Sequence, residues 1–244
     1  MRIWAISDTH GRHAKLVVPP NIDMVIHAGD FANDKRPVSN LVEANDFIEW
    51  MRGLDIRYKV VTPGNHDLAV QPYGLKDFFD TTGIHLLVHR AKTIGGVRLF
   101  GSPYTPTYGT GWAYNKSRNR MQAVWNSIPE ETDIVITHGP PKGILDLTED
   151  KESKRMVQVG CKSLLNRIKE IQPSVHIFGH IHSESKADNH GVLIRDEITY
   201  INASCVKNRH PEVLYPGIVF EFGLDLKEHR KKYYREDGKG NRVD

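Results

Sequence analysis

The segment YKVVTPGNHDL, residues 58–68, joins a short apolar run to a turn that contains an amide, an imidazole and a carboxylate. The run YKVV is typical of a strand buried on both faces of a layered α/β fold. The turn needs its glycine for a sharp bend, but a bend alone does not need Asn65, His66 and Asp67 in succession. These three residues therefore indicate a functional site at the end of a strand.

Four other apolar runs end in turns of the same kind. They are RIWAISDTHG (2–11), DMVIHAGD (23–30), DIVITHGPP (133–141) and SVHIFGHIH (174–182). Ligands of open α/β sheets gather at the carboxyl ends of the strands, so we expect the polar side chains of all five turns to lie together. These side chains are Asp8, His10, Asp30, Asn65, His66, His138, His180 and His182.

Helical periodicity separates several of these runs. Apolar residues spaced at i, i+3, i+4 and i+7 predict helices over 36–52, over 121–128 and over 164–171. Strands that alternate with helices predict an α/β fold. Two other histidines, His27 and His176, fall inside apolar runs and are predicted to be hydrogen-bonded core residues, whereas His13 lies close to the first motif and is a weaker candidate for the site.

Further β-structure follows the third motif. Residues 85–103 predict a hairpin with Gly95-Gly96 at its turn, and the segments 198–205 and 217–222 predict later strands. No linker divides the chain, so we expect a single domain over 1–244, with a core at about 1–222 and a charged tail at 223–244.

Composition is ordinary for a globular protein: 39% of the 244 residues are hydrophobic and 26% are charged. A formal charge of +3 gives no strong signal for nucleic acid. There is no apolar run of about 20 residues and no secretory leader, and the two cysteines form no metal-binding pair. We therefore expect a cytoplasmic protein with reduced thiols and no membrane partner.

The residue types of the five turns select a chemistry. Imidazole, carboxylate and carboxamide groups without thiolate suit divalent Mn, Fe, Zn, Co or Ni. Two such ions roughly 3.5–4 Å apart can hold both the attacking and the leaving oxygen of a displacement at phosphorus. Two ions bring four positive charges, and Asp8, Asp30 and a bridging hydroxide remove three of them. The positive charge that is left suits an anionic phosphate substrate.

The order D-x-H, G-D, G-N-H-D, H, G-H-x-H resembles the calcineurin-like metallophosphoesterase family, and the resemblance extends from residue 3 to about 206. The segments DIVITHGPPKGILD, VHIFGHIH and TYINASC are more specifically similar to its small, brain-type metallophosphoesterase-domain phosphodiesterases. The resemblance implies a four-layer α/β/β/α sandwich, in which two mixed β-sheets are flanked by helices.

The resemblance also implies two groups of metal ligands that share one carboxylate, and it favours Mn as the metal. Asp8, His10 and His182 would hold the first ion, and Asn65, His138 and His180 the second, with Asp30 as the bridge. His66 would bind the substrate phosphate and protonate the leaving alkoxide after attack by the metal-bridging hydroxide, while Asp67 would orient its imidazole.

The long segment 102–120 is predicted to form a wall of the substrate site, because loops of this length often cover active sites. Its aromatic residues could stack on a nucleobase and its arginines could bind a phosphate. The predicted substrate-binding residues are Asn65, His66, Tyr104, Trp112, Arg118 and Asn202.

We expect a phosphodiesterase for small nucleotides, including cyclic ones. A phosphomonoesterase or protein phosphatase is an alternative, and a nuclease is less compatible with the short chain and low charge. A non-catalytic binding module of the same fold is a fourth reading, which the complete set of ligand residues disfavours. The sequence leaves the substrate, the metal and the oligomeric state open.

Overall fold

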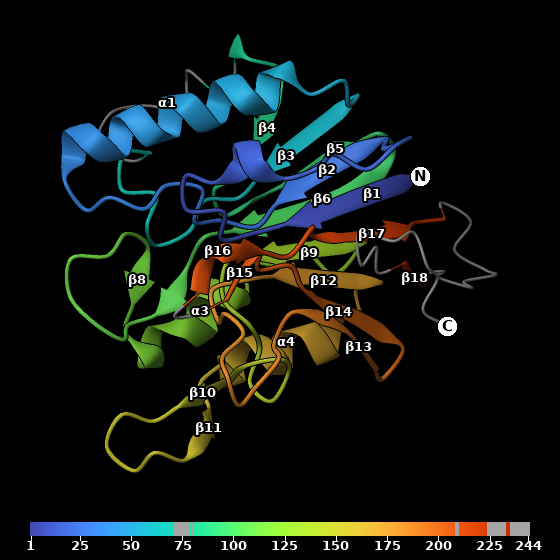
Figure 1. Cartoon of the computed structure of the whole chain (residues 1–244). Helices are drawn as coiled ribbons and strands as arrows, with labels where there is room; N and C mark the ends of the chain where they lie inside the picture. Colours follow the sequence, from blue (N-terminus) through green and yellow to red (C-terminus); the bar gives the residue numbers. More distant parts are fainter. Residues whose placement is uncertain (71–78, 80, 208–209, 224–232, 235–244) are drawn as a thin grey trace.

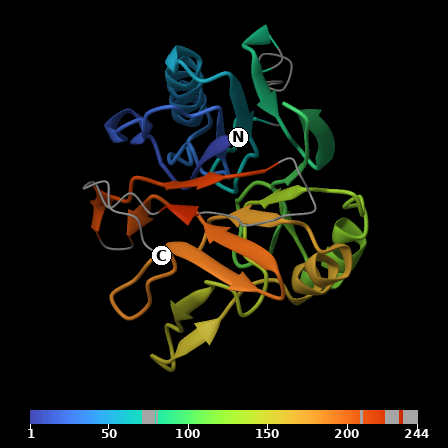
Figure 2. The ribbon, with the colours of Figure 1, turned by 90° about the vertical axis from the view of Figure 1, so that its right-hand side faces the viewer.

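Two six-stranded β-sheets form the centre of the protein, and helices lie on the outer face of each (Figure 1). The computed structural model describes residues 1–70, 79, 81–207, 210–223 and 233–234. Figure 2 shows the two sheets stacked one above the other. The predicted α/β/β/α sandwich of two mixed sheets is therefore confirmed.

The first sheet has the order β18-β17-β1-β2-β3-β4. Its strands are β1 (Arg2–Ile6), β2 (Met24–His27), β3 (Tyr58–Val61), β4 (Ile84–Leu86), β17 (Ile218–Glu221) and β18 (Tyr233–Tyr234). Strands β1 to β4 are parallel, and β17 and β18 add an antiparallel edge. Helix α1 (Pro37–Gly53) covers this sheet (Figure 1).

The second sheet has the order β13-β14-β12-β9-β6-β5. Its strands are β5 (Arg90–Ile94), β6 (Val97–Ser102), β9 (Ile134–Thr137), β12 (Val175–Phe178), β13 (Gly191–Arg195) and β14 (Ile198–Asn202). The four central strands are parallel and both edges are antiparallel. Helices α3 (Met121–Trp125) and α4 (Lys162–Ile171) lie against its outer face.

Short elements connect these layers. Three two-stranded ribbons and two 3₁₀ turns occur among the described residues. The ribbons are β7 (Thr105–Pro106) with β8 (Asn115–Lys116), β10 (Leu147–Glu149) with β11 (Met156–Gln158), and β15 (Val206–Lys207) with β16 (His210–Leu214), and the 3₁₀ turns are η1 (His13–Lys15) and η2 (Arg118–Arg120).

Three apolar clusters hold the layers together, and the alternation of side chains in β1 shows how. Ile3 and Ala5 pack between the two sheets, whereas Trp4 and Ile6 pack beneath α1. Successive strand residues point to opposite faces, so a strand buried on both faces is apolar throughout. A third cluster fills the space between the second sheet, α3 and α4.

The helix predicted over 121–128 is shorter than expected, and this prediction needs correction. Helix α3 ends at Trp125, and the amides of Ser127 and Ile128 then bond to carbonyls three residues earlier. These bonds tighten the last turn before Pro129, which disfavours helical backbone in the residue that precedes it. The helices predicted over 36–52 and 164–171 are confirmed. The predicted hairpin over 85–103 is confirmed over 90–102, with Gly95-Gly96 at its turn, whereas residues 85–86 belong to β4 of the first sheet.

The predicted charged tail, residues 223–244, lies mostly outside the described residues. Over the part of the chain that the structure describes, no helix combines the length and the apolar character needed to cross a bilayer.

Candidate metal centre

Five strand ends from the two sheets supply the polar groups of one site. The turns after β1, β2 and β3 come from the first sheet, and those after β9 and β12 come from the second. Backbone bonds join the turns: the amide of Asp8 donates to Gly29, and the amide of Gly179 donates to His138. All eight side chains that the sequence analysis predicted to lie together are close in space. They form groups that share His10 or Asp30, and Asn65 joins one of them.

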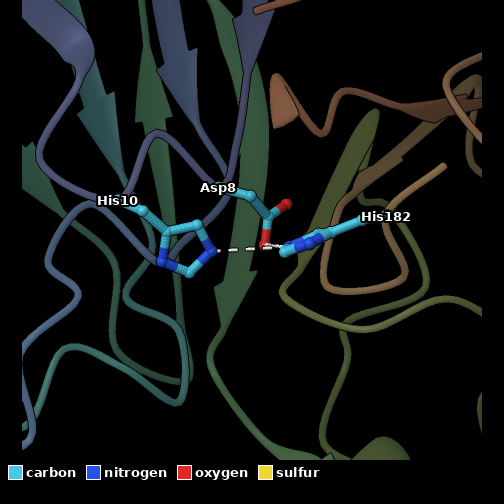
Figure 3. Close-up of side chains that lie close together, drawn as sticks. All are labelled: Asp8, His10 and His182. Atoms are coloured by element: carbon cyan, nitrogen blue, oxygen red, sulfur yellow. Dashed lines mark hydrogen bonds and ion pairs between the residues drawn. The ribbon is translucent and has the colours of Figure 1, made fainter. Parts of the chain in front are cut away.

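The first group contains Asp8, His10 and His182, whose possible ligand atoms lie within 4.8 Å of one another. Figure 3 shows the two imidazoles on either side of the Asp8 carboxylate. His182 Nε2 lies 3.2 Å from Asp8 Oδ1 and 3.4 Å from His10 Nε2. His10 Nδ1 lies 3.3 Å from the carbonyl of Ala32.

The second group contains Asp30, His138 and His180, which satisfy the same distance limit. Asn65 joins them, because its Oδ1 lies 2.9 Å from His138 Nε2. The same nitrogen lies 3.3 Å from Asp30 Oδ2. On its other side, His138 Nδ1 lies 3.0 Å from the carbonyl of Ala28.

The donor set of both groups fits divalent cations. A backbone carbonyl can only accept a hydrogen bond, so Ala32 and Ala28 assign the proton of neutral His10 and His138 to Nδ1. The Nε2 atom of each ring then carries a lone pair. In the second group, the Nε2 lone pair of His138 faces the oxygen lone pairs of Asp30 and Asn65. Such a convergence repels unless a positive centre, a proton or a metal ion, lies within it.

Electrostatics at the site agree with this reading. Burial alone would raise the pKa of Asp8, but the hydrogen bond and charge of His182 hold it below its usual value. Burial would also lower the pKa of His138, yet Asp30 raises it to about 9. Burial lowers the pKa of His10 to about 4 and that of His180 to about 3. Those two imidazoles are therefore neutral at pH 7, which is the form that binds metals.

The backbone of the turns is unusual at the candidate ligands. Asp8, His10, Asp30 and His180 have φ values of 53°, 44°, 57° and 68°, in the left-handed region that most side chains avoid. Such strain persists where surrounding structure fixes it, often at functional sites. Glycines allow the close packing of these turns: a Cβ on Gly179 would lie 2.1 Å from Asp8 Oδ2.

His66 lies beside both groups with its ring partly exposed. Its Nε2 is 4.0 Å from Asp30 Oδ2, and its Nδ1 is 3.2 Å from the carbonyl of Asn33. That carbonyl accepts a hydrogen bond from Nδ1–H and is the group that orients the imidazole. The sequence could not have indicated this acceptor, because every residue has a backbone carbonyl and the residue type does not mark the one that is used.

Asp67 does not orient His66, so this prediction needs correction. Its Oδ1 accepts the N–H of Ala32 at 2.9 Å, and its Oδ2 accepts those of Asp30 at 2.9 Å and Gly64 at 2.6 Å. The fully buried carboxylate holds the turn after β2 against the turn after β3. It therefore fixes the backbone that carries Asp30 and Asn65.

Asn40, on α1, is a supporting residue that the sequence reasoning missed. It is fully buried and donates to the carbonyls of His66 and Asp34, each at 2.7 Å, while it accepts the N–H of Ala69 at 2.8 Å. An asparagine on the apolar face of the predicted 36–52 helix was the signal that could have identified it.

A cavity of about 390 Å³ opens beside the metal centre and is lined by His66, Trp112 and Arg118 among others. Tyr104 and Asn202, also predicted to bind substrate, do not line it. Tyr104 packs against Tyr114 and His89. Asn202 is fully buried and donates to the carbonyls of Leu145 and Ile181, so both predictions need correction.

Tyr108, one of the aromatic residues of the predicted wall 102–120, also lines the cavity. Thr148 and Glu184 line it as well, and the sequence analysis did not select these two polar residues. Thr148 donates to Glu184 at 2.9 Å, which joins β10 to the turn after His182. Polar residues of this kind are common in loops and gave no distinctive pattern.

The remaining histidines of interest lie outside the site. His27 pairs with Thr9 and His176 with Thr137, which confirms both as core residues. His13 is buried against Phe47 and contacts Asp46. It takes no part in the metal centre.

Comparisons with known proteins agree with this geometry. The family described as calcineurin-like phosphoesterase matches residues 1–184. Metallophosphoesterase domain-containing protein 1 of Homo sapiens is 35% identical in an alignment that covers 90% of this chain and 70% of that protein. The fold is similar to that of the phosphopantetheinyl hydrolase of Mycobacterium tuberculosis, with a TM-score of 0.54, 16% identity, and coverage of 83% of this chain and 88% of that chain. The protein TT1561 of Thermus thermophilus gives the same TM-score and coverage at 12% identity.

Proposed function

This chain belongs to the calcineurin-like phosphoesterase family, and from that premise we propose that it is a two-metal phosphodiesterase for small nucleotide or cyclic-nucleotide substrates. The family uses divalent metals, and membership in it supports metal-dependent phosphoesterase activity for this chain. Manganese is the ion we propose, since histidine, carboxylate and amide ligands suit it.

The observation that carries the proposal is the position of the cavity. Its lining includes Asp30, Asn65 and His66 of the metal centre together with Tyr108, Trp112 and Arg118. A phosphodiester needs room for two organic groups, and the volume of about 390 Å³ is within the range of small-molecule sites. The aromatic wall suits a flat organic group such as a nucleobase.

Charge along the cavity favours a diester over a monoester. Beyond the metal centre, Arg118 and Glu184 are the charged residues that line it, and their formal charges cancel. A diester has one negative charge, which the cations can balance. A dianionic monoester would gain from further basic groups, and none besides Arg118 lines this cavity among the described residues.

Seven side chains would hold the two cations: Asp8, His10, Asp30, Asn65, His138, His180 and His182. When bound, the cations would supply Lewis-acid activation of the phosphate and of a nucleophilic water. His66 would hold a proton at Nε2 for the departing alkoxide, with Nδ1 fixed by the Asn33 carbonyl. The buried Nδ2 of Asn65, which has no partner among the described residues, could donate to a phosphate oxygen.

A pair of chromogenic esters tests the proposal. The protein is loaded with Mn²⁺ and assayed with bis-p-nitrophenyl phosphate and with p-nitrophenyl phosphate, then with cyclic nucleotides and dinucleotides. We expect kcat/KM for the diester to exceed that for the monoester by about tenfold or more, which corresponds to a difference of about 1.4 kcal/mol in activation free energy. Asp30→Ala removes the shared ligand, and Asp55→Ala, at an exposed residue, is the matched control.

Other outcomes select the alternatives. A preference for the monoester would contradict the diesterase proposal and favour a phosphomonoesterase. No turnover of any ester by the Mn²⁺-bound protein would favour a non-catalytic binding module. The predicted cytoplasmic location and the predicted lack of a membrane or nucleic-acid partner stay predictions.

A further inference from the structure

Residues 105–116, here called the aromatic arch, lie over the metal centre. Strands β7 and β8 close its base, and the amide of Thr107 donates to the carbonyl of Lys116 at 2.8 Å. The tip of the arch reaches the site in two places. Tyr108 lies 5.0 Å from His180, and Trp112 lies 4.3 Å from His66, as measured between ring centroids.

Trp112 is held in place by three contacts. The ammonium of Lys35 lies 3.7 Å from the centre of its ring, a cation–π distance. The next residue, Ala113, donates its N–H to the carbonyl of Asn65 at 3.1 Å. The ring of Tyr108 is stacked beside the indole at 6.2 Å. The indole is therefore fixed relative to the turn that carries His66.

The side chain of His66 needs such support. Within the described part of the chain, one hydrogen bond holds its ring, from Nδ1 to the Asn33 carbonyl at 3.2 Å, and a single bond lets an imidazole tilt. Ring contacts with His10 at 4.7 Å and with Trp112 restrict that motion. Asn33 and Lys35 belong to the same short loop, so this loop holds the imidazole directly and also through the indole.

We infer that Trp112, braced by Lys35, is a positioning residue that fixes the His66 imidazole for proton transfer to the leaving group. The inference rests on the proposed function, in which His66 is the proton donor. It assigns Trp112 a role distinct from that of a substrate wall. Misplacement of a catalytic group by about 1 Å can cost about 10²-fold in rate, so the support of the ring matters.

The two roles of Trp112 predict different kinetics. A positioning residue acts through His66, so its loss lowers kcat only where leaving-group protonation limits the rate. A wall residue contributes binding, so its loss raises KM whether or not His66 is present. Bis-p-nitrophenyl phosphate releases a stable phenolate that needs no proton, whereas a cyclic nucleotide releases an alkoxide that does.

The kinetic experiment compares Trp112→Leu, Trp112→Phe, His66→Asn and the Leu/Asn double variant on both substrates. We expect Trp112→Leu to lower kcat for the alkoxide substrate by about 10- to 100-fold, and for the phenolate substrate by less than about threefold. Trp112→Phe keeps an aromatic ring and should remain within about threefold of wild type. In the His66→Asn background, Trp112→Leu should have no further effect on kcat.

Equal losses on both substrates, an additive loss in the double variant, or a change confined to KM would overturn the inference. The contact between Lys35 and Trp112 is tested with separate variants of Lys35 and a control variant of Arg36. Lys35→Met should lower kcat for the alkoxide substrate by about threefold, and Lys35→Arg should restore it. Arg36→Met removes a neighbouring exposed cation that pairs with Asp34 and should change nothing. Equal effects of Lys35→Met and Arg36→Met would count against the brace.

A spectroscopic arm separates this inference from the proposed function. In Zn²⁺-loaded protein, which is diamagnetic, the Nδ1 proton of His66 should give a sharp NMR signal that exchanges slowly with water. Trp112→Leu should broaden that signal and speed its exchange, and Trp112→Phe should not. If no ester is hydrolysed, the proposed function fails, yet this signal still tests the position of the ring. An unchanged His66 signal in Trp112→Leu overturns the positioning role.

Discussion

Replacing Asp67 by asparagine is the sharpest probe of how this centre is held. The carboxylate accepts three buried backbone N–H groups, those of Asp30, Ala32 and Gly64. Burial and the charge of Asp30 raise the pKa of Asp67, while the hydrogen bonds from Ala32 and Gly64 oppose the rise. Since all three of these partners donate, the ionised form is the one that fits.

The structure gives the magnitude. An asparagine can place its oxygen at the position of Oδ2 and keep the bonds to Asp30 and Gly64. Its amide then faces the N–H of Ala32, another donor. The lost charge-assisted bond contributes about 1.5–3 kcal/mol, and a buried donor without an acceptor costs about 1–3 kcal/mol. Removal of the charge repulsion between Asp67 and Asp30 offsets part of these two costs. We therefore expect a loss of about 3 kcal/mol in the free energy of unfolding.

Urea denaturation of metal-free wild type, Asp67→Asn and Asp55→Asn measures this loss. The exposed Asp55 controls for the removal of one negative charge, and its variant should stay within about 0.5 kcal/mol of wild type. The same proteins are then titrated with Mn²⁺. Since Asp67 fixes the turns that carry Asp30 and Asn65, Mn²⁺ affinity should fall by about 10- to 100-fold.

Kinetics separate this backbone role of Asp67 from a direct action on His66. If Asp67 acted on His66, the substitution would lower kcat only for alkoxide leaving groups and leave both stability and Mn²⁺ affinity intact. That pattern would contradict the role assigned here. A loss of stability and metal affinity, with turnover restored at saturating Mn²⁺, is the expected outcome.

Three further predictions follow from the same contacts. His66→Ala should leave Mn²⁺ content unchanged, as measured by elemental analysis, and lower turnover of alkoxide substrates by about 10²–10⁴-fold; full activity would remove its acid role. In metal-free protein, Asp30 raises the pKa of His138 from 6.5 to about 9. The protonated imidazole of His138 therefore contributes its full stabilisation below pH 6.5, and this contribution is lost as the pH rises through 9. Urea denaturation should show a loss of about 3 kcal/mol over that window, absent in His138→Gln. Gly179→Ala places a Cβ 2.1 Å from Asp8 Oδ2 and should weaken Mn²⁺ binding, whereas Gly53→Ala, which meets nothing within 4 Å, should bind Mn²⁺ like wild type.

The gathering of the ligands could be predicted from the sequence, because the carboxyl ends of parallel strands share one edge. Asp8 and Asp30 illustrate this, since β1 and β2 are adjacent and parallel. The same rule was wrong for Asn202, which is the last residue of β14 but donates its side-chain amide to the backbone carbonyls of Leu145 and Ile181. A strand end places a residue near the edge and does not decide where its side chain points.

The arrangement of two sheets came from the family resemblance, because periodicity does not assign a strand to a sheet. Strand β17 lies more than 200 residues from β1 in sequence and yet pairs with it. The role of Asp67 was misjudged for a related reason. Adjacent residues in a turn point in different directions, so its position next to His66 in sequence implied a contact that the turn does not make.

The side chains of five strand ends should converge on two cations, and anomalous diffraction from Mn²⁺-soaked crystals would locate those ions. We expect two anomalous peaks roughly 3.5–4 Å apart, with Asp30 between them. In Asp30→Ala crystals both peaks should weaken together. One peak or none in the wild-type protein would exclude a two-metal centre, and two undiminished peaks in the variant would exclude Asp30 as the shared ligand.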